Sequence, residues 1–432
     1  MKFTERKREK NYLIKKSMIT PLFKVDQNED FVFINIRAPY IKATSLQFEV
    51  ADDVFVFSLP PYYLRLRLPG MLIEDEFMDS QYDLKTNEVK CRVSKLNKGE
   101  EFKDLDMLSK LLATKKQTNV SKPLIQEVDD ENYEYDSDID FEEDIEIEQN
   151  LSEPLESGKS IAYGFNNQYT EHIGVSVHAG NEINELDEPE TTPPAERLIQ
   201  MKEKTMKKFD PQYYLADLND DEMIQELIKF DFITDFELNA VMHDRLVKLG
   251  NRKFLLSDPK SIYLGLVPLV FAWAYDHRTN MGDLTVESSW TVGKLSPSLC
   301  FLYNDYHKMK DLIIDCSERA LSQPLYRHWQ LIISTWGDVL KIFENGKKAL
   351  LFVMVKLLEI FENEVHFCYR QIFIEDYAIW VQYASEKVIE SLFSELNKAI
   401  HDLSKRDVRF QLRELEVTGL GEHMEDSDDE SE

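Results

Sequence analysis

Apolar residues recur with one spacing in the N-terminal part of the chain and with another in the C-terminal part. From Ile19 to about Leu112, apolar and polar residues alternate, which predicts strands with one buried and one solvated face. The alternation is clearest in three stretches, Leu46 to Val50, Tyr62 to Leu68 and Val89 to Val93. Because turn residues separate these stretches and no long helical pattern lies among them, we predict an antiparallel β-sandwich.

Two further runs in this part are apolar without alternation, namely Phe31 to Ile36 and Val54 to Leu59. A continuous apolar run is typical of a strand that is covered on both faces. We therefore expect both faces of these two strands to be buried.

After Pro193 the apolar spacing changes to three and four, which predicts helices joined by short loops. Leu325 to Phe343 has one apolar face and begins after Pro324, whereas Ala349 to Phe361 is apolar on nearly every side and belongs at the centre of a bundle. Gly346 suits the cap between these two helices, which predicts a helical hairpin. The other predicted helices are Ala195 to Lys208, Asp220 to Phe230, Asp235 to Leu249, Pro259 to Tyr275, Cys300 to Leu321 and Asp376 to Leu403.

The negative charge of the chain is concentrated in two segments. The net charge is -29, and the stretch from Glu127 to Glu156 has fifteen acidic residues with no Lys or Arg. The stretch from Glu422 to Glu432 has seven more acidic residues and no base. Both compositions predict solvated chain without a core. Direct nucleic-acid binding is disfavoured, because phosphate contacts need clustered Lys and Arg, and a basic partner is favoured.

Two short segments leave alternatives open. The first seventeen residues are basic, and Arg6 to Arg8 is either a nuclear import signal or part of a disordered leader, with Met18 as an alternative start. Tyr163 to Phe165 is an aromatic island that either docks on one of the domains or stays within the acidic spacer.

The sequence shows no equipment for catalysis, cofactor binding or membrane insertion. No phosphate-binding, dinucleotide, zinc-protease or nucleophile-elbow motif is present, so we expect no enzyme activity, no cofactor and no metal. The four cysteines are widely spaced and are expected to be free thiols. The longest apolar runs are too short to cross a bilayer. His328 is the most tempting single catalytic candidate, but we expect a histidine that is hydrogen-bonded at a helix end or packed between helices.

Three surfaces are candidates for partner binding. Tyr63, Arg65 and Arg67 project from one side of a strand, which makes either an ordinary polar face or a cationic groove for an acidic or peptide-like partner. Tyr326, Arg327 and His328 lie at a helix N-terminus, where backbone donors either attract an acidic group or are used in packing. The third surface is Trp290 with Lys294, which falls in a predicted break between helices as a core plug or an interface anchor.

Several stretches resemble a known family. Met18 to Phe23, Pro60 to Gly70 and Phe102 to Ala113 resemble the CS-type domain that opens the SHQ family of H/ACA ribonucleoprotein assembly chaperones. The later stretches that resemble that family's own C-terminal domain are Phe209 to Asp217, Val286 to Leu302, Arg319 to His328 and Ile372 to Gln382.

The resemblance and the patterns together predict a multidomain β plus α protein. Its parts are a basic leader at 1–17, a CS-type antiparallel β-sandwich at 18–113 and an acidic flexible linker at 114–192. An all-helical domain at 193–416 and an acidic disordered tail at 417–432 complete the chain. We expect the fragment 193–416 alone to bind the main partner.

The resemblance implies a non-enzymatic assembly chaperone of box H/ACA particles. It implies binding to the dyskerin-type pseudouridine synthase before RNA joins, release with help from AAA+ ATPases of the pontin and reptin type, and work in nucleoplasm and cytoplasm. We expect a monomer that does not contact nucleic acid directly. The alternative is a CS-domain co-chaperone of the ninety-kilodalton heat-shock ATPase. It is disfavoured because all five Trp lie between Trp273 and Trp380, outside the sandwich.

Overall fold

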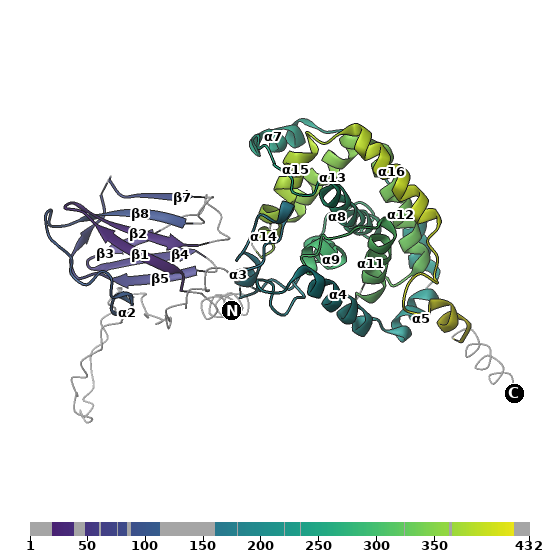
Figure 1. The fold of residues 1–432 in the computed structure, drawn as a ribbon, viewed down its shortest axis with the longest axis horizontal. Helices are drawn as coiled ribbons and strands as arrows, with labels where there is room; N and C mark the ends of the chain where they lie inside the picture. The colour runs from purple at the N-terminus through teal and green to yellow at the C-terminus, as the bar shows by residue number, and fades with distance from the viewer. Residues whose placement is uncertain are drawn as a thin grey trace, which may run out of the picture. The chain divides into compact units, whose positions relative to one another are not determined.

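The computed structural model describes residues 20–38, 48–59, 62–75, 77–83, 88–112, 160–178, 180–219, 221–233, 235–323, 325–362 and 365–418. It divides the chain into two compact units, Met1–Leu155 and Glu156–Glu432 (Figure 1). The basic leader, the acidic run 127–156 and the tail after residue 418 lie outside the described residues. No described helix is both long enough and apolar enough to cross a bilayer.

The N-terminal unit is the predicted sandwich of antiparallel strands. One sheet has the strand order β1-β2-β8-β6, with β7 also paired to β8, and the other has the order β3-β4-β5. The strands are β1 (Leu22–Gln27), β2 (Phe31–Arg37), β3 (Phe48–Ala51), β4 (Val54–Leu59), β5 (Tyr62–Arg67), β6 (Leu72–Ile73), β7 (Asp79–Asp83) and β8 (Glu88–Lys95), followed by the short helix α2 (Leu108–Leu111).

The inner faces of the two sheets supply the core of the sandwich. Val32, Ile34 and Ile36 of β2 are fully buried, and alternate residues of β4 and β5 are buried in the same way. Phe31 and Phe33, which alternate with these residues on the other face of β2, are only half-buried. The expectation that β2 and β4 are covered on both faces was therefore wrong, because apolar residues on their outer faces stay partly in solvent.

The C-terminal unit is helical, and its helices surround α8 and α13 (Figure 1). Nearly every residue of α8 from Leu264 to Tyr275 is buried, and α13 is buried on almost all sides, as its apolar pattern predicted. The longer helices are α4 (Pro194–Lys208), α6 (Asp221–Lys229), α7 (Ala240–Lys248), α8 (Pro259–Thr279), α11 (Met309–Ser322), α12 (Trp329–Glu344), α13 (Gly346–Ile360) and α16 (Glu386–His401).

Further helices complete the unit, and only Asn345 separates α12 from α13 in the hairpin. Gly346 has a φ of +65°, a left-handed conformation that glycine adopts without steric cost. The shorter elements are η2 (Phe165–Asn167), α3 (Ile173–His178), α5 (Pro211–Asn219), α9 (Ser288–Leu295), α10 (Pro297–Cys300), α14 (Phe367–Tyr369), the π-helical η3 (Arg370–Ile374) and α15 (Glu375–Val381). Residues 412–418 form a last helical segment.

Several predicted helices differ from the structure at their ends. The helix predicted from Cys300 to Leu321 is interrupted at residues 301–308, where Leu302 has a φ of +51° and Tyr303 and Tyr306 pack edge to face. The helix predicted from Asp376 to Leu403 is broken at residues 382–385, where the Ser385 amide donates to the Tyr263 hydroxyl. Arg197 also donates to the Leu302 carbonyl oxygen, so both breaks make contacts with distant residues that the local pattern did not reveal.

The largest correction concerns residues 160–192, which the sequence assigned to the flexible linker. This segment, which we call the entry segment, is folded onto the helical unit. Asn181 donates to the Tyr369 hydroxyl at 3.1 Å, and Arg197 of α4 donates to the Ile161 and Pro189 carbonyl oxygens. The ring of Phe165 packs against Tyr377 and Trp380 of α15, so the aromatic island docks on the helical unit. The buried apolar residues of the segment are Tyr163, Phe165, Ile173, Ile183 and Leu186.

Candidate functional site

The residues just before α12 are tightly held. The His328 Nδ1 atom accepts a hydrogen bond from the Leu331 amide at 3.4 Å, and His328 is only 8% exposed. The interpretation of His328 as a histidine bonded at a helix end is confirmed. The helix itself begins at Trp329 rather than directly after Pro324.

Tyr326 and Arg327 connect this turn to neighbouring helices. The Tyr275 hydroxyl donates to the Tyr326 carbonyl oxygen at 2.9 Å, and the Arg327 amide donates to Asp217 Oδ2 at 2.7 Å. The Arg327 guanidinium lies 4.8 Å from the ring centroid of Tyr213, whose side chain is exposed. The backbone of the turn is therefore used in packing, while the Arg327 and Tyr213 pair reaches the surface.

Beside this turn lies a groove of about 540 Å³, which we call the α12 groove. Lys405 is paired with Glu416, and Glu416 also accepts a hydrogen bond from the Tyr214 hydroxyl. The exposed Arg413 has no ion-pair partner among the described residues. The groove can therefore hold carboxylate groups. It is lined by Leu218, His328, Trp329, Gln330, Ser404, Lys405, Arg413 and Glu416.

The predicted sheet surface is present on the N-terminal unit. Tyr63, Arg65 and Arg67 alternate with the buried residues of β5, so all three lie on the outer face of the three-stranded sheet. Val54 and Val56 of β4, which pair with Arg67 and Arg65, are half-buried. The Arg67 guanidinium donates to both carboxylate oxygens of Asp53, at 3.1 and 3.0 Å, which offsets part of the positive charge.

The third predicted surface does not exist in the form expected. Trp290 and Lys294 lie on α9 rather than in a break between helices, and Lys294 is only 7% exposed. The Lys294 ammonium lies 3.2 Å from Glu185 Oε1 and donates to the Ile183 carbonyl oxygen. Lys294 therefore holds the entry segment, while Trp290 on the same helix is half-buried.

Glu185 is the centre of a buried ion cluster that the sequence did not reveal. Both of its carboxylate oxygens accept hydrogen bonds from Arg319 of α11, at 2.6 and 3.2 Å, and Lys208 lies 2.9 Å away. Burial alone would raise the pKa of Glu185, but Arg319, Lys294 and Lys208 outweigh it and lower the pKa to about 2. Glu185 is thus charged in the interior and joins the entry segment to α4, α9 and α11.

One serine and histidine pair is placed like a nucleophile and its base. Ser289 Oγ and His366 Nδ1 are 2.9 Å apart. Burial, with a smaller effect of Lys294, lowers the pKa of His366 to about 4, so its imidazole is neutral near pH 7. Ser289 is only 3% exposed, and a substrate would not reach its hydroxyl. Packing of α9 explains this pair better than catalysis.

Metal and thiol chemistry receive no support from the described residues. Within the described ranges, no three His, Cys, Asp or Glu side chains are grouped as metal ligands. The cysteines are free thiols, as predicted, and all are buried. The features that remain for function are the α12 groove, the outer face of the small sheet and the acidic segments.

Comparison with known proteins gives matches in both units. A family model described as "SHQ1-like, CS domain" matches residues 20–112, and one described as "SHQ1 protein, Shq1 domain" matches residues 227–412. "Protein shq1" of Schizosaccharomyces pombe is 35% identical over 450 aligned residues, which cover 96% of this chain and 99% of that protein. "Protein SHQ1 homolog" of Xenopus tropicalis is 33% identical, covering 92% of this chain and 69% of that protein. The Caenorhabditis elegans protein of the same name is 30% identical, covering 96% and 99%.

Proposed function

The chain belongs to the SHQ1 family, and from this premise we propose that it is an assembly chaperone for box H/ACA small nucleolar ribonucleoproteins. It binds the dyskerin-type pseudouridine synthase before RNA does and covers the RNA-binding surface of that enzyme. The observation that carries the proposal is the extent of the match, because both family domains are present and relatives align over nearly the whole chain.

The electrostatics of the chain support this role. A protein surface that binds RNA presents clustered Lys and Arg, and it attracts a protein of net charge -29. Such attraction weakens as salt screens the charges. The chaperone thus takes the place of RNA on the synthase until RNA displaces it, and the chemistry of modification belongs to the synthase.

The two compact units suggest a division of labour. The helical unit has the larger folded core and makes the main contact with the synthase, while the sandwich braces a second region across the acidic linker. Because the linker is rich in acidic residues, it also favours a basic partner. We place this complex in nucleoplasm and cytoplasm, with one chaperone per synthase, and assign its dismantling to AAA+ ATPases of the pontin and reptin type.

The proposal is tested by size-exclusion chromatography of the purified chain mixed with the purified synthase. We expect a one-to-one complex that elutes ahead of both components at low salt and dissociates as salt rises. The ninety-kilodalton heat-shock ATPase is mixed with the chain in a parallel run. Co-elution with that ATPase and not with the synthase would replace the proposal with the co-chaperone alternative.

The outer face of the small sheet is expected to supply the second contact. The double variant Arg65→Glu and Arg67→Glu should weaken synthase binding by about threefold to tenfold, since each exposed charge pair contributes about 0.2 to 1 kcal/mol. The fold should persist, because both side chains lie outside the sandwich core. Calorimetric titration measures the effect, with Lys24→Glu on β1 of the other sheet as the matched control. An affinity equal to that of the control would make these residues an ordinary polar face.

A further inference from the structure

The α12 groove lies beside the point where the described chain stops. Arg413 and Glu416, which line it, belong to the helical segment 412–418, and the remaining fourteen residues follow directly. Fourteen residues span at most about 46 to 50 Å when extended, which is ample for the chain to turn back. The tail is therefore long enough to reach the groove.

The charges of the groove and the tail are complementary. The tail from Glu422 to Glu432 holds seven acidic residues and no base. In the groove, the exposed Arg413 offers guanidinium donors. Lys405 is paired with Glu416, whose carboxylate also accepts a hydrogen bond from the Tyr214 hydroxyl. Arg binds carboxylates through paired, charge-assisted hydrogen bonds.

The tail is a better occupant than the other acidic segment of the chain. The run from Glu127 to Glu156 is joined in sequence to the entry segment, whereas the groove is lined by residues 218, 328–330, 404, 405, 413 and 416. The tail instead leaves the chain within a few residues of Glu416, so its carboxylates have a high effective concentration at the groove. Proximity and charge both favour the tail.

We propose that the α12 groove is a docking site for the chain's own acidic tail, residues 419–432. Tail carboxylates pair with Arg413 and approach Lys405, next to the turn that carries Arg327 and His328. This docking goes beyond the proposed function and does not depend on it, because it takes place in the isolated chain.

The test is carbodiimide crosslinking of the full chain at high dilution, which joins Lys amines to nearby carboxylates, followed by peptide mass spectrometry. The ion pair between Lys405 and Glu416 supplies one product as an internal reference. We expect a second product between Lys405 and residues 422–432, with a yield that falls at high salt. An isotope-labelled mixture of chains distinguishes products within one molecule from products between molecules.

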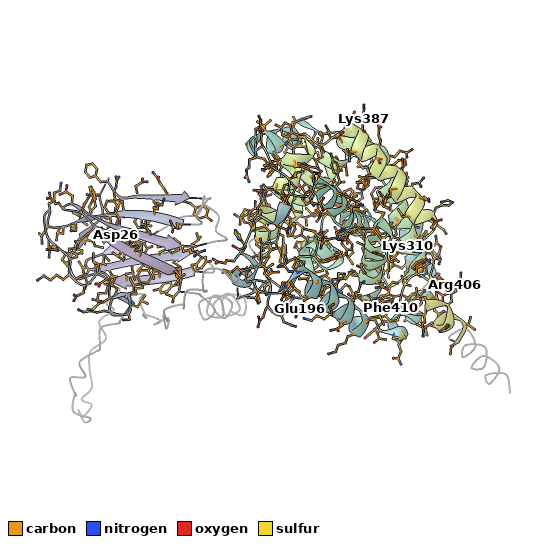
Figure 2. All side chains as sticks on the ribbon, in the orientation of Figure 1. Asp26, Glu196, Lys310, Lys387, Arg406 and Phe410 are labelled. Atoms are coloured by element: carbon orange, nitrogen blue, oxygen red, sulfur yellow. The ribbon has the colours of Figure 1, made fainter. Side chains whose placement is uncertain are left out.

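Two charge reversals complete the test. Arg413→Glu should lower the yield of the Lys405-to-tail product about threefold or more relative to the reference, because an exposed attraction becomes a repulsion. Lys387→Glu, at the far end of α16 from Arg406 and the groove, should leave it unchanged (Figure 2). The proposal is overturned if the product is absent, forms between molecules, survives Arg413→Glu undiminished, or joins Lys405 to the run 127–156 instead.

Discussion

A fragment that begins at residue 193 is expected to be unfolded, whereas one that begins at residue 156 is expected to keep the full helical unit. The first boundary follows the apolar pattern of the sequence, and the second follows the structure. The difference between them is the entry segment, which supplies both apolar and ionic contacts to the interior.

The size of the effect follows from what the shorter fragment loses. Tyr163, Phe165, Ile173, Ile183 and Leu186 are all nearly or fully buried. Each such side chain contributes about 1.5 to 3 kcal/mol by burial, which makes the total on the order of 10 kcal/mol. That is comparable to the whole stability of a typical domain, about 5 to 15 kcal/mol. The loss of Glu185 adds a penalty by leaving Arg319 buried without its carboxylate.

Circular dichroism and thermal unfolding of the fragments 156–432 and 193–432 measure how much the entry segment contributes to the stability of the helical unit. We expect a cooperative transition for the longer fragment and none for the shorter one. A cooperative transition of equal midpoint in both would show that the entry segment is not part of the fold. Only the longer fragment is then suitable for asking whether the helical unit alone retains synthase binding.

Replacing Glu185 by Ala should destabilise the helical unit by about 3 to 5 kcal/mol, the usual cost of removing one partner from a buried ion pair. Arg319 is fully buried, and Lys294 nearly so, and both depend on this carboxylate for charge balance. Glu185→Gln keeps the shape of the side chain but removes its charge, so it should cause most of the destabilisation expected for Glu185→Ala. Glu182→Gln, at an exposed position of the same segment, is the matched control and should have little effect.

The pH dependence of this contribution has a definite sign. The pKa of Glu185 is lowered in the folded state, from an ordinary value of 4.5 to about 2. Its stabilisation is therefore complete above pH 4.5 and is lost as the pH falls toward 2. Chemical denaturation of wild type and Glu185→Gln should show the largest difference near neutral pH and a narrowing difference below pH 4.5. A difference that does not change with pH would mean that the charge of Glu185 is not what stabilises the unit.

The sequence predicted those parts of the fold whose pattern repeats within one element. A period of two placed Tyr63, Arg65 and Arg67 on one face of β5, and the all-round apolar character of α13 placed it in the interior. The histidine at the start of α12 was also interpreted correctly, because capping depends on neighbouring residues. In each case the information is local.

The rest depends on contacts between residues far apart in the chain. Glu185 meets Arg319 across 134 positions, and neither residue belongs to an apolar period that would mark it as buried. The burial of Lys294 could not be predicted, because a charged side chain is rarely buried unless it is paired, and its partner Glu185 is distant in the chain. The α12 groove was missed for the same reason, since its cations come from residues after α16.

The most direct test of the account is a competition between this chain and guide RNA for the synthase. The preformed complex of chain and synthase is titrated with H/ACA guide RNA, and the chain released is measured by size-exclusion chromatography. Competitive shielding predicts that RNA displaces the chain, and that added chain raises the apparent dissociation constant of RNA in proportion to its concentration. A stable ternary complex, in which RNA binds the synthase with undiminished affinity while the chain stays bound, would contradict it.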